Sequence, residues 1–89
     1  MIDKGSLVQS KKGHDLGRVY LVVDIDSTFA ICVDGKFRKI ENPKKKRLKH
    51  LQDLFVISHE FASKIEQNKL HDFEVTTLIR NNKSIMHKD

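Results

Sequence analysis

Residues 18–35 read RVYLVVDIDSTFAICVDG, and this stretch decides the expected fold. Apolar residues occupy every second position from Val19 to Ile25, which is the period of a half-buried β-strand. A similar alternation returns over residues 28–33, and the Asp34-Gly35 pair that follows is a strong hairpin signal. We therefore predict strands over residues 18–25 and 28–33, with the odd-numbered side chains of the first strand facing the core.

Three further segments extend the predicted sheet. Residues 5–10 precede a loop with two glycines, residues 36–41 follow the hairpin turn, and residues 50–57 come after a lysine-rich segment. Asn42-Pro43 ends the fourth strand, because proline cannot donate to a sheet ladder. Five short strands joined by tight turns within residues 1–57 indicate a mainly β fold, a small SH3-like barrel.

The chain changes character after residue 57. Ser58 is a suitable N-cap for a helix over residues 59–68, and Asp72 can cap a second helix that runs to about residue 81. Because isolated helices of this length are marginally stable in water, we expect residues 58–81 to pack as a helical extension on the barrel. Residues 82–89 read as a flexible tail.

The positive charge of the chain is concentrated in one segment. The net charge is +5, and eight of the 17 Lys and Arg but only one of the 12 Asp and Glu fall between Lys36 and His50. That segment therefore carries +7 and the rest of the chain sums to −2. A local basic patch of this kind is typical of a protein that binds a polyanion.

Several classes of function find no support in the sequence. Cys32 is the only cysteine, which excludes an internal disulfide and a cysteine-rich zinc finger. The five histidines are scattered without metal-ligand spacing, and no nucleophile elbow or phosphate loop is present. We expect a protein that is not an enzyme, with no metal and no cofactor. Since no apolar run is long enough for a membrane span or a signal peptide, we also expect it to be cytoplasmic.

Residues 8–23 resemble the KOW motif, a loop and strand of alternating character around a glycine, here Gly17. Residues 5–51 as a whole are similar to bacterial KOW-domain RNA-binding proteins related to the large-subunit ribosomal proteins of archaea and eukaryotes. The segments DGKFRKI (34–40) and PKKKRLKHL (43–51) carry the more specific part of this resemblance. It implies an SH3-like barrel, an RNA-binding role and a link to the ribosome or to translation, with ribosomal RNA as the partner.

Basic residues in three places are the candidate RNA contacts. The lysine cluster after Pro43, taken as a basic loop, is the main phosphate clamp, because like charges packed so closely repel one another unless an anion binds. The fourth strand extends this patch, and the first loop forms a second surface. The candidates are Lys44, Lys45, Lys46, Arg47 and Lys49 in the cluster, Lys36, Arg38 and Lys39 in the strand, and Lys11, Lys12, His14 and Arg18 around the loop.

Two alternatives stay open at this point. Base stacking needs exposed rings, and Tyr20 and Phe37 are the only aromatic residues outside the clear core pattern, where partial burial is the competing expectation. The other four phenylalanines are assigned to core or helix packing. The second alternative is a protein-interaction module of the NusG type, which would dock a partner through the apolar stripes of the helices, namely Phe61, Ile65, Val75, Leu78 and Ile79.

Overall fold

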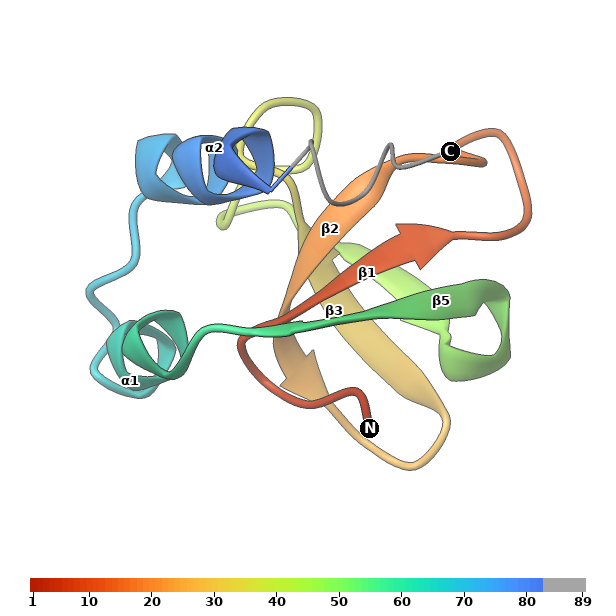
Figure 1. The fold of residues 1–89 in the computed structure, drawn as a ribbon, viewed down its shortest axis with the longest axis horizontal. Coiled ribbons are helices and arrows are strands. Elements are labelled where there is room, and N and C mark those ends of the chain that lie inside the picture. The colour runs from red at the N-terminus through yellow and green to blue at the C-terminus, as the bar shows by residue number, and fades with distance from the viewer. Residues whose placement is uncertain (83–89) are drawn as a thin grey trace.

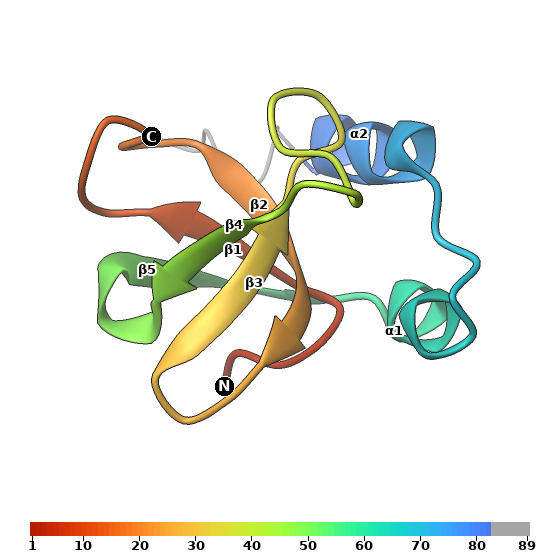
Figure 2. The same cartoon turned by 180° about the vertical axis from the view of Figure 1, so that it is seen from behind.

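A computed structural model describes residues 1–82 of the chain. Five antiparallel strands form one sheet, in the order β4-β3-β2-β1-β5, and two helices follow (Figures 1 and 2). The strands are β1 (Ser6–Ser10), β2 (Val19–Ile25), β3 (Phe29–Val33), β4 (Lys44–Arg47) and β5 (Leu51–Ile57). A 3₁₀ turn, η1 (Leu48–His50), precedes β5, and the helices are α1 (His59–Glu66) and α2 (Asp72–Asn81). The mainly β class and the two C-terminal helices are confirmed.

The fourth strand is not where the sequence predicted it. Residues 36–41 belong to a long loop, and the strand that pairs with β3 is β4, inside the lysine cluster, with Ala30 opposite Lys46. The reason lies at Asp34, whose carboxylate accepts the backbone N–H groups of Lys36 and Arg38 and so closes a turn that cannot continue as a ladder. The predicted basic loop is therefore a strand followed by a 3₁₀ turn.

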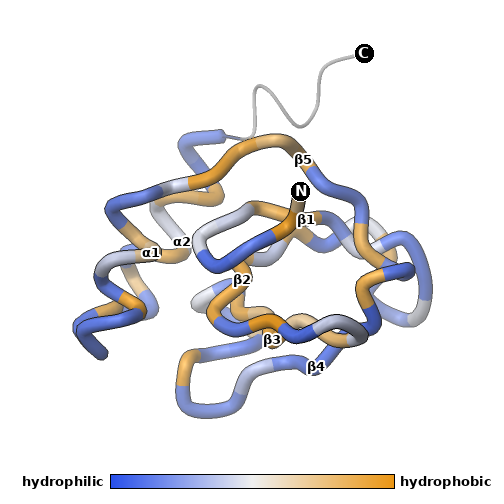
Figure 3. The backbone as a smooth tube through the Cα atoms, turned by 90° about the horizontal axis from the view of Figure 1, so that it is seen from below, coloured by the Kyte–Doolittle hydropathy of each residue, from blue (hydrophilic) through white to orange (hydrophobic). Residues whose placement is uncertain are grey.

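Both faces of the sheet are buried, where only the odd-numbered face was predicted to be. Tyr20 and Val22 of β2 lie in one core cluster with Val8 of β1, Ala30 and Cys32 of β3, and Leu51 of β5. The opposite face forms a second cluster, Leu7, Leu21 and Val33, with Phe61 of α1 and Val75 of α2. The helices thus cover one face, while the bending of the sheet buries the other (Figure 3).

The two edge strands are close in sequence although they lie at opposite ends of the strand order. Only the three residues of η1 separate β4 from β5, so the sheet must bend strongly to bring the end of one edge to the start of the other. The Lys11 backbone N–H donates to the His50 carbonyl at 2.8 Å and fixes this corner to the end of β1.

Both helices form where predicted, with shorter or altered ends. Ser58 caps α1 by accepting the Phe61 N–H, as expected, but α1 ends at Glu66. The residue before α2 is His71, whose N–H donates to Glu74, so Asp72 is the first helical residue and not the cap. Asp72 instead accepts the backbone N–H of Ile40 at 2.8 Å.

Two of the phenylalanines assigned to packing are exposed. Phe55 is 82% exposed and has a φ of +59° at an irregularity in the pairing of β5 with β1, and Phe73 of α2 is 70% exposed. Among the described residues, no helix is both long and apolar enough to cross a membrane. Apart from Asn82, the predicted tail lies outside the described residues.

Candidate nucleic-acid interface

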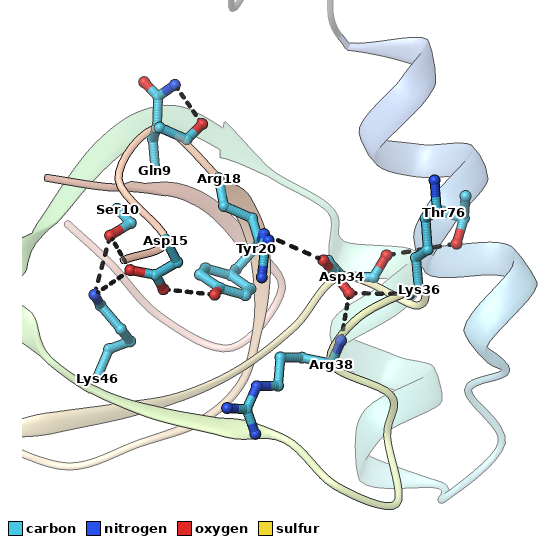
Figure 4. A network of polar contacts seen from close by, with 11 residues as sticks. Gln9, Ser10, Asp15, Arg18, Tyr20, Asp34, Lys36, Arg38, Lys46 and Thr76 are labelled. Carbon is cyan, nitrogen blue, oxygen red and sulfur yellow. Dashed lines mark hydrogen bonds and ion pairs between the residues drawn. The ribbon is translucent and has the colours of Figure 1, made fainter. Parts of the chain in front are cut away.

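The side chain of Lys46 points into the bent sheet and not into solvent. Its ammonium donates to Asp15 Oδ1 at 2.9 Å and to Ser10 Oγ at 3.0 Å (Figure 4). It also donates to the Lys12 carbonyl at 2.9 Å. These three acceptors use all three donors of the ammonium. These contacts hold the loop of residues 11–18 against β4. Because Lys46 is only 8% exposed, its ammonium is not free to meet a phosphate.

Asp15 is the acceptor at the centre of this network. Tyr20 donates its hydroxyl to Asp15 Oδ2 at 2.6 Å, and Ser10 Oγ lies 2.8 Å from Oδ1. Burial by itself raises the pKa of Asp15, but the hydrogen bonds from Tyr20, Lys46 and Ser10 outweigh it and hold that pKa well below its usual range. Burial and the Asp15 carboxylate together raise the pKa of Tyr20. The loop is therefore anchored by a carboxylate that stays ionised.

The alternation of side chains along β4 divides the lysine cluster between two faces. Lys44 and Lys46 share the face of Cys32 and Ala30, their partners in β3. Lys45 and Arg47 lie on the other face, where Lys45 Nζ is 4.4 Å and Arg47 Cζ is 5.1 Å from the centre of the Phe29 ring. The basic residues of the cluster thus do not form one phosphate clamp, because β4 directs its alternate side chains to opposite faces of the sheet.

The loop of residues 34–43 is held by α2. Besides the two N–H groups that it accepts, Asp34 receives the hydroxyl of Thr76 on its backbone carbonyl at 3.4 Å. Gly35 has a φ of +79°, and a Cβ there would stand 2.3 Å from the Asp72 carbonyl oxygen. Only glycine fits this close approach, so the loop and its basic side chains are fixed against the first turn of α2.

A basic groove runs between the two loops. It is lined by His14, Arg18, Arg38 and Lys44 around Tyr20, with a volume of about 340 Å³. The carboxylate within it, Asp15, is already paired with Lys46. The accessible charge of the groove is therefore positive, and its walls come from the loop of residues 11–18, the loop of residues 34–43 and β4.

A second pocket shares Arg18 with the basic groove. It has a volume of about 430 Å³ and lies between Phe37 and α2, which contributes Thr76, Ile79 and Arg80. Phe37 is 63% exposed, so the partial burial expected of it is slight, whereas Tyr20 is fully buried. Arg80 was not among the predicted contacts, because nothing in the sequence distinguishes it from an ordinary charge on the outer face of a helix.

The structure brings together some of the predicted contacts and separates others. His14, Arg18, Arg38 and Lys44 line the basic groove, and Lys36 lines the adjoining pocket. Lys11, Lys12, Lys39 and Lys49 are exposed but line neither of these two hollows. Lys45 and Arg47 face the other way, and Lys46 is an internal anchor.

The described residues offer little material for metal or thiol chemistry. Within residues 1–82, no group of three or more His, Cys, Asp or Glu side chains is placed to hold a metal ion. Cys32 is buried in the core, and burial raises the pKa of its thiol to about 12. A protonated, covered thiol is a poor nucleophile.

No family model matches this chain, and no curated protein matches it either.

Proposed function

We propose that this protein binds RNA without catalysing a reaction, and that it does so through the basic groove. One observation carries the proposal: four basic residues converge on a hollow in which Asp15 is already paired internally. A polyanion entering the groove would meet cations without displacing an existing ion pair of the lining carboxylate. The release of counterions from its phosphates then favours binding.

Within this proposal, the groove positions the phosphate backbone and does not read base sequence. Arg38 can donate two parallel hydrogen bonds to one phosphate, while Lys44 acts as a compact point charge. Arg18, whose Nε lies 3.9 Å from Asp34 Oδ2, adds positive charge at the edge of the groove. Both loops are anchored before RNA arrives, through Lys46 on one side and Gly35 on the other. A pre-organised site loses little conformational entropy on binding.

The resemblance to KOW-domain proteins supports the choice of RNA and of a cytoplasmic, ribosome- or translation-associated role, with ribosomal RNA as the proposed partner. We also propose that the bent sheet closes as an SH3-like barrel. The strand order and the three-residue connection between the edge strands support closure at the η1 corner.

The protein-docking alternative finds less support in the arrangement of the helices. It required exposed apolar stripes, but Phe61 and Val75 are buried, and Ile65, Leu78 and Ile79 pack against the same core cluster. These side chains are already engaged by the sheet, which leaves Phe73 as the large apolar side chain that α2 exposes.

A charge-reversal experiment tests the proposal. We expect Arg38→Glu/Lys44→Glu to reduce affinity for a ribosomal RNA fragment by at least about a hundredfold at low salt, since phosphate contacts become repulsions. The matched control is Lys45→Glu/Arg47→Glu, which makes the same change in net charge on the opposite face of β4. Equal losses in the two variants would mean that net charge and not the groove governs binding. A wild-type protein that binds no RNA and is absent from ribosomal fractions would overturn the function.

A further inference from the structure

Phe37 is an exposed aromatic ring with two cations close to it. The Arg18 guanidinium carbon lies 4.5 Å from the centre of the ring, and Lys36 Nζ lies 5.2 Å from it. The ring nevertheless keeps 63% of its surface exposed, so a second flat group can still reach it.

The loop around Phe37 is held in place from both sides. Asp34 accepts the N–H groups of Lys36 and Arg38, which flank Phe37 directly, at 2.9 and 2.7 Å. Gly35 packs against Asp72 and Thr76 of α2. The ring is therefore presented in one place by backbone contacts, and a ligand that stacks on it does not have to order the loop first.

The pocket next to Phe37 combines two kinds of wall. Val19 and Ile79 are apolar, while Arg18, Lys36 and Arg80 are cationic, and the volume of about 430 Å³ lies within the range of about 300–1,000 Å³ found for small-ligand sites. The pocket also has one carboxylate, Asp34, which is mostly buried and lies 3.9 Å from Arg18 Nε, so the lining keeps a net positive charge. A flat apolar ring with a negative group attached fits such a lining better than a purely apolar or purely anionic ligand. A nucleotide has that composition.

We propose that this pocket takes one unpaired RNA base, which stacks on Phe37 while its phosphates lie near Arg18 and Arg80. This inference rests on the proposed RNA-binding function and deepens it. In an RNA duplex the faces of the bases are covered by their neighbours, whereas loops and bulges present bases that can be splayed out onto an aromatic side chain. The expected ligand is therefore an RNA in which an unpaired nucleotide lies next to a duplex. The basic groove would bind the phosphate backbone of the duplex, and the pocket would bind the unpaired base.

Two RNAs of equal length distinguish the proposal from simple phosphate binding: a perfect duplex, and the same duplex with a single bulged nucleotide. We expect wild-type protein to prefer the bulged RNA. Phe37→Ala should lower affinity for it on the order of tenfold, the scale measured when a stacking side chain is removed, and should leave duplex affinity unchanged. Because Phe37 is exposed, the variant is expected to fold, and a thermal melt checks this.

Phe37→Trp provides a direct optical readout. The chain contains no tryptophan, so the introduced indole is the only one in the protein. We expect its fluorescence to be quenched by the bulged RNA and much less by the duplex, while affinity for the bulged RNA is retained. Equal affinity of wild type for both RNAs, or equal quenching by both, would overturn the stacking proposal alone. Failure of the protein to bind either RNA would overturn the proposed function itself.

Discussion

The Lys46 ammonium lies 2.9 Å from Asp15 Oδ1, and both side chains are about nine-tenths buried. This pair joins β4 to the loop of residues 11–18, segments about thirty positions apart in sequence. It converts a lysine from the middle of a basic cluster into an internal anchor. The basic groove has its shape because this contact fixes one of its walls.

Lys46→Met should therefore destabilise the protein by about 3 kcal/mol, because it leaves the Asp15 carboxylate buried without its cation. Lys45→Met, on the exposed face of the same strand, should cost less than about 1 kcal/mol. Urea unfolding measures both values. If both variants lost the same free energy of unfolding, the Lys46–Asp15 ion pair would add no more stability than an exposed lysine does. In the double variant Lys46→Met/Asp15→Asn, the loss should be smaller than the sum of the single losses.

The pH dependence of stability should depend on Asp15. Its pKa is lowered on folding, so its stabilisation is fully present above the unfolded pKa of about 3.9 and is lost as pH falls toward the lower folded pKa. We expect Asp15→Asn to be less stable than wild type at pH 7, and the difference to shrink below about pH 4. Denaturant midpoints measured at pH 7, 4 and 2.5 check this, and a difference that stays constant with pH would contradict it.

Gly35 and Gly17 offer a matched pair of glycine substitutions. Both have positive φ, but a Cβ at Gly35 would meet Asp72 and Thr76, whereas one at Gly17 would meet nothing within 4 Å. Gly17→Ala should cost about 1 kcal/mol from backbone strain, and Gly35→Ala at least about 2 kcal/mol because the loop must also move off α2. Thermal unfolding compares them. If Gly35→Ala were no worse than Gly17→Ala, the close packing of the loop on α2 would be contradicted.

The salt dependence of RNA affinity should show how many phosphate contacts the basic groove makes. Each phosphate contact contributes about 0.7 to 0.9 to the magnitude of the slope of log affinity against log salt. We expect Arg38→Ala/Lys44→Ala, which removes two contacts, to reduce that magnitude by about 1.4 to 1.8, and Lys45→Ala/Arg47→Ala to leave it nearly unchanged. Fluorescence anisotropy over a series of salt concentrations measures the slopes. If Lys45→Ala/Arg47→Ala reduced the slope more than Arg38→Ala/Lys44→Ala, RNA would bind on the opposite face of β4 and not in the basic groove.

The Cys32 thiol should be inert in the folded protein. It is buried and its pKa is raised to about 12, so a thiol reagent should label it only as fast as the protein opens. We expect full labelling in denaturant and slow labelling in buffer at pH 8. Rapid labelling of the native protein would contradict the burial of β3.

Local pattern was enough to predict most of the elements. Four of the five strands lie within one or two residues of their predicted bounds, and Ser58 caps α1 as expected. The prediction of a fourth strand over residues 36–41 was wrong, because the hairpin signal at Asp34-Gly35 does not reveal that the Asp34 carboxylate accepts two backbone N–H groups. The packing stripes of the helices could be predicted from their period, but the exposure of Phe55 at positive φ could not.

The sequence by itself determined the mainly β class, the helical end and the concentration of positive charge, because alternation, helical period and composition are local properties of the chain. Only the tertiary structure decided what each charge does. Lys44, Lys45 and Lys46 are chemically identical neighbours, yet one lines the basic groove, one covers Phe29 and one is buried on Asp15. The physical reason is that a strand sends successive side chains to opposite faces, and the partner on each face comes from a distant part of the chain.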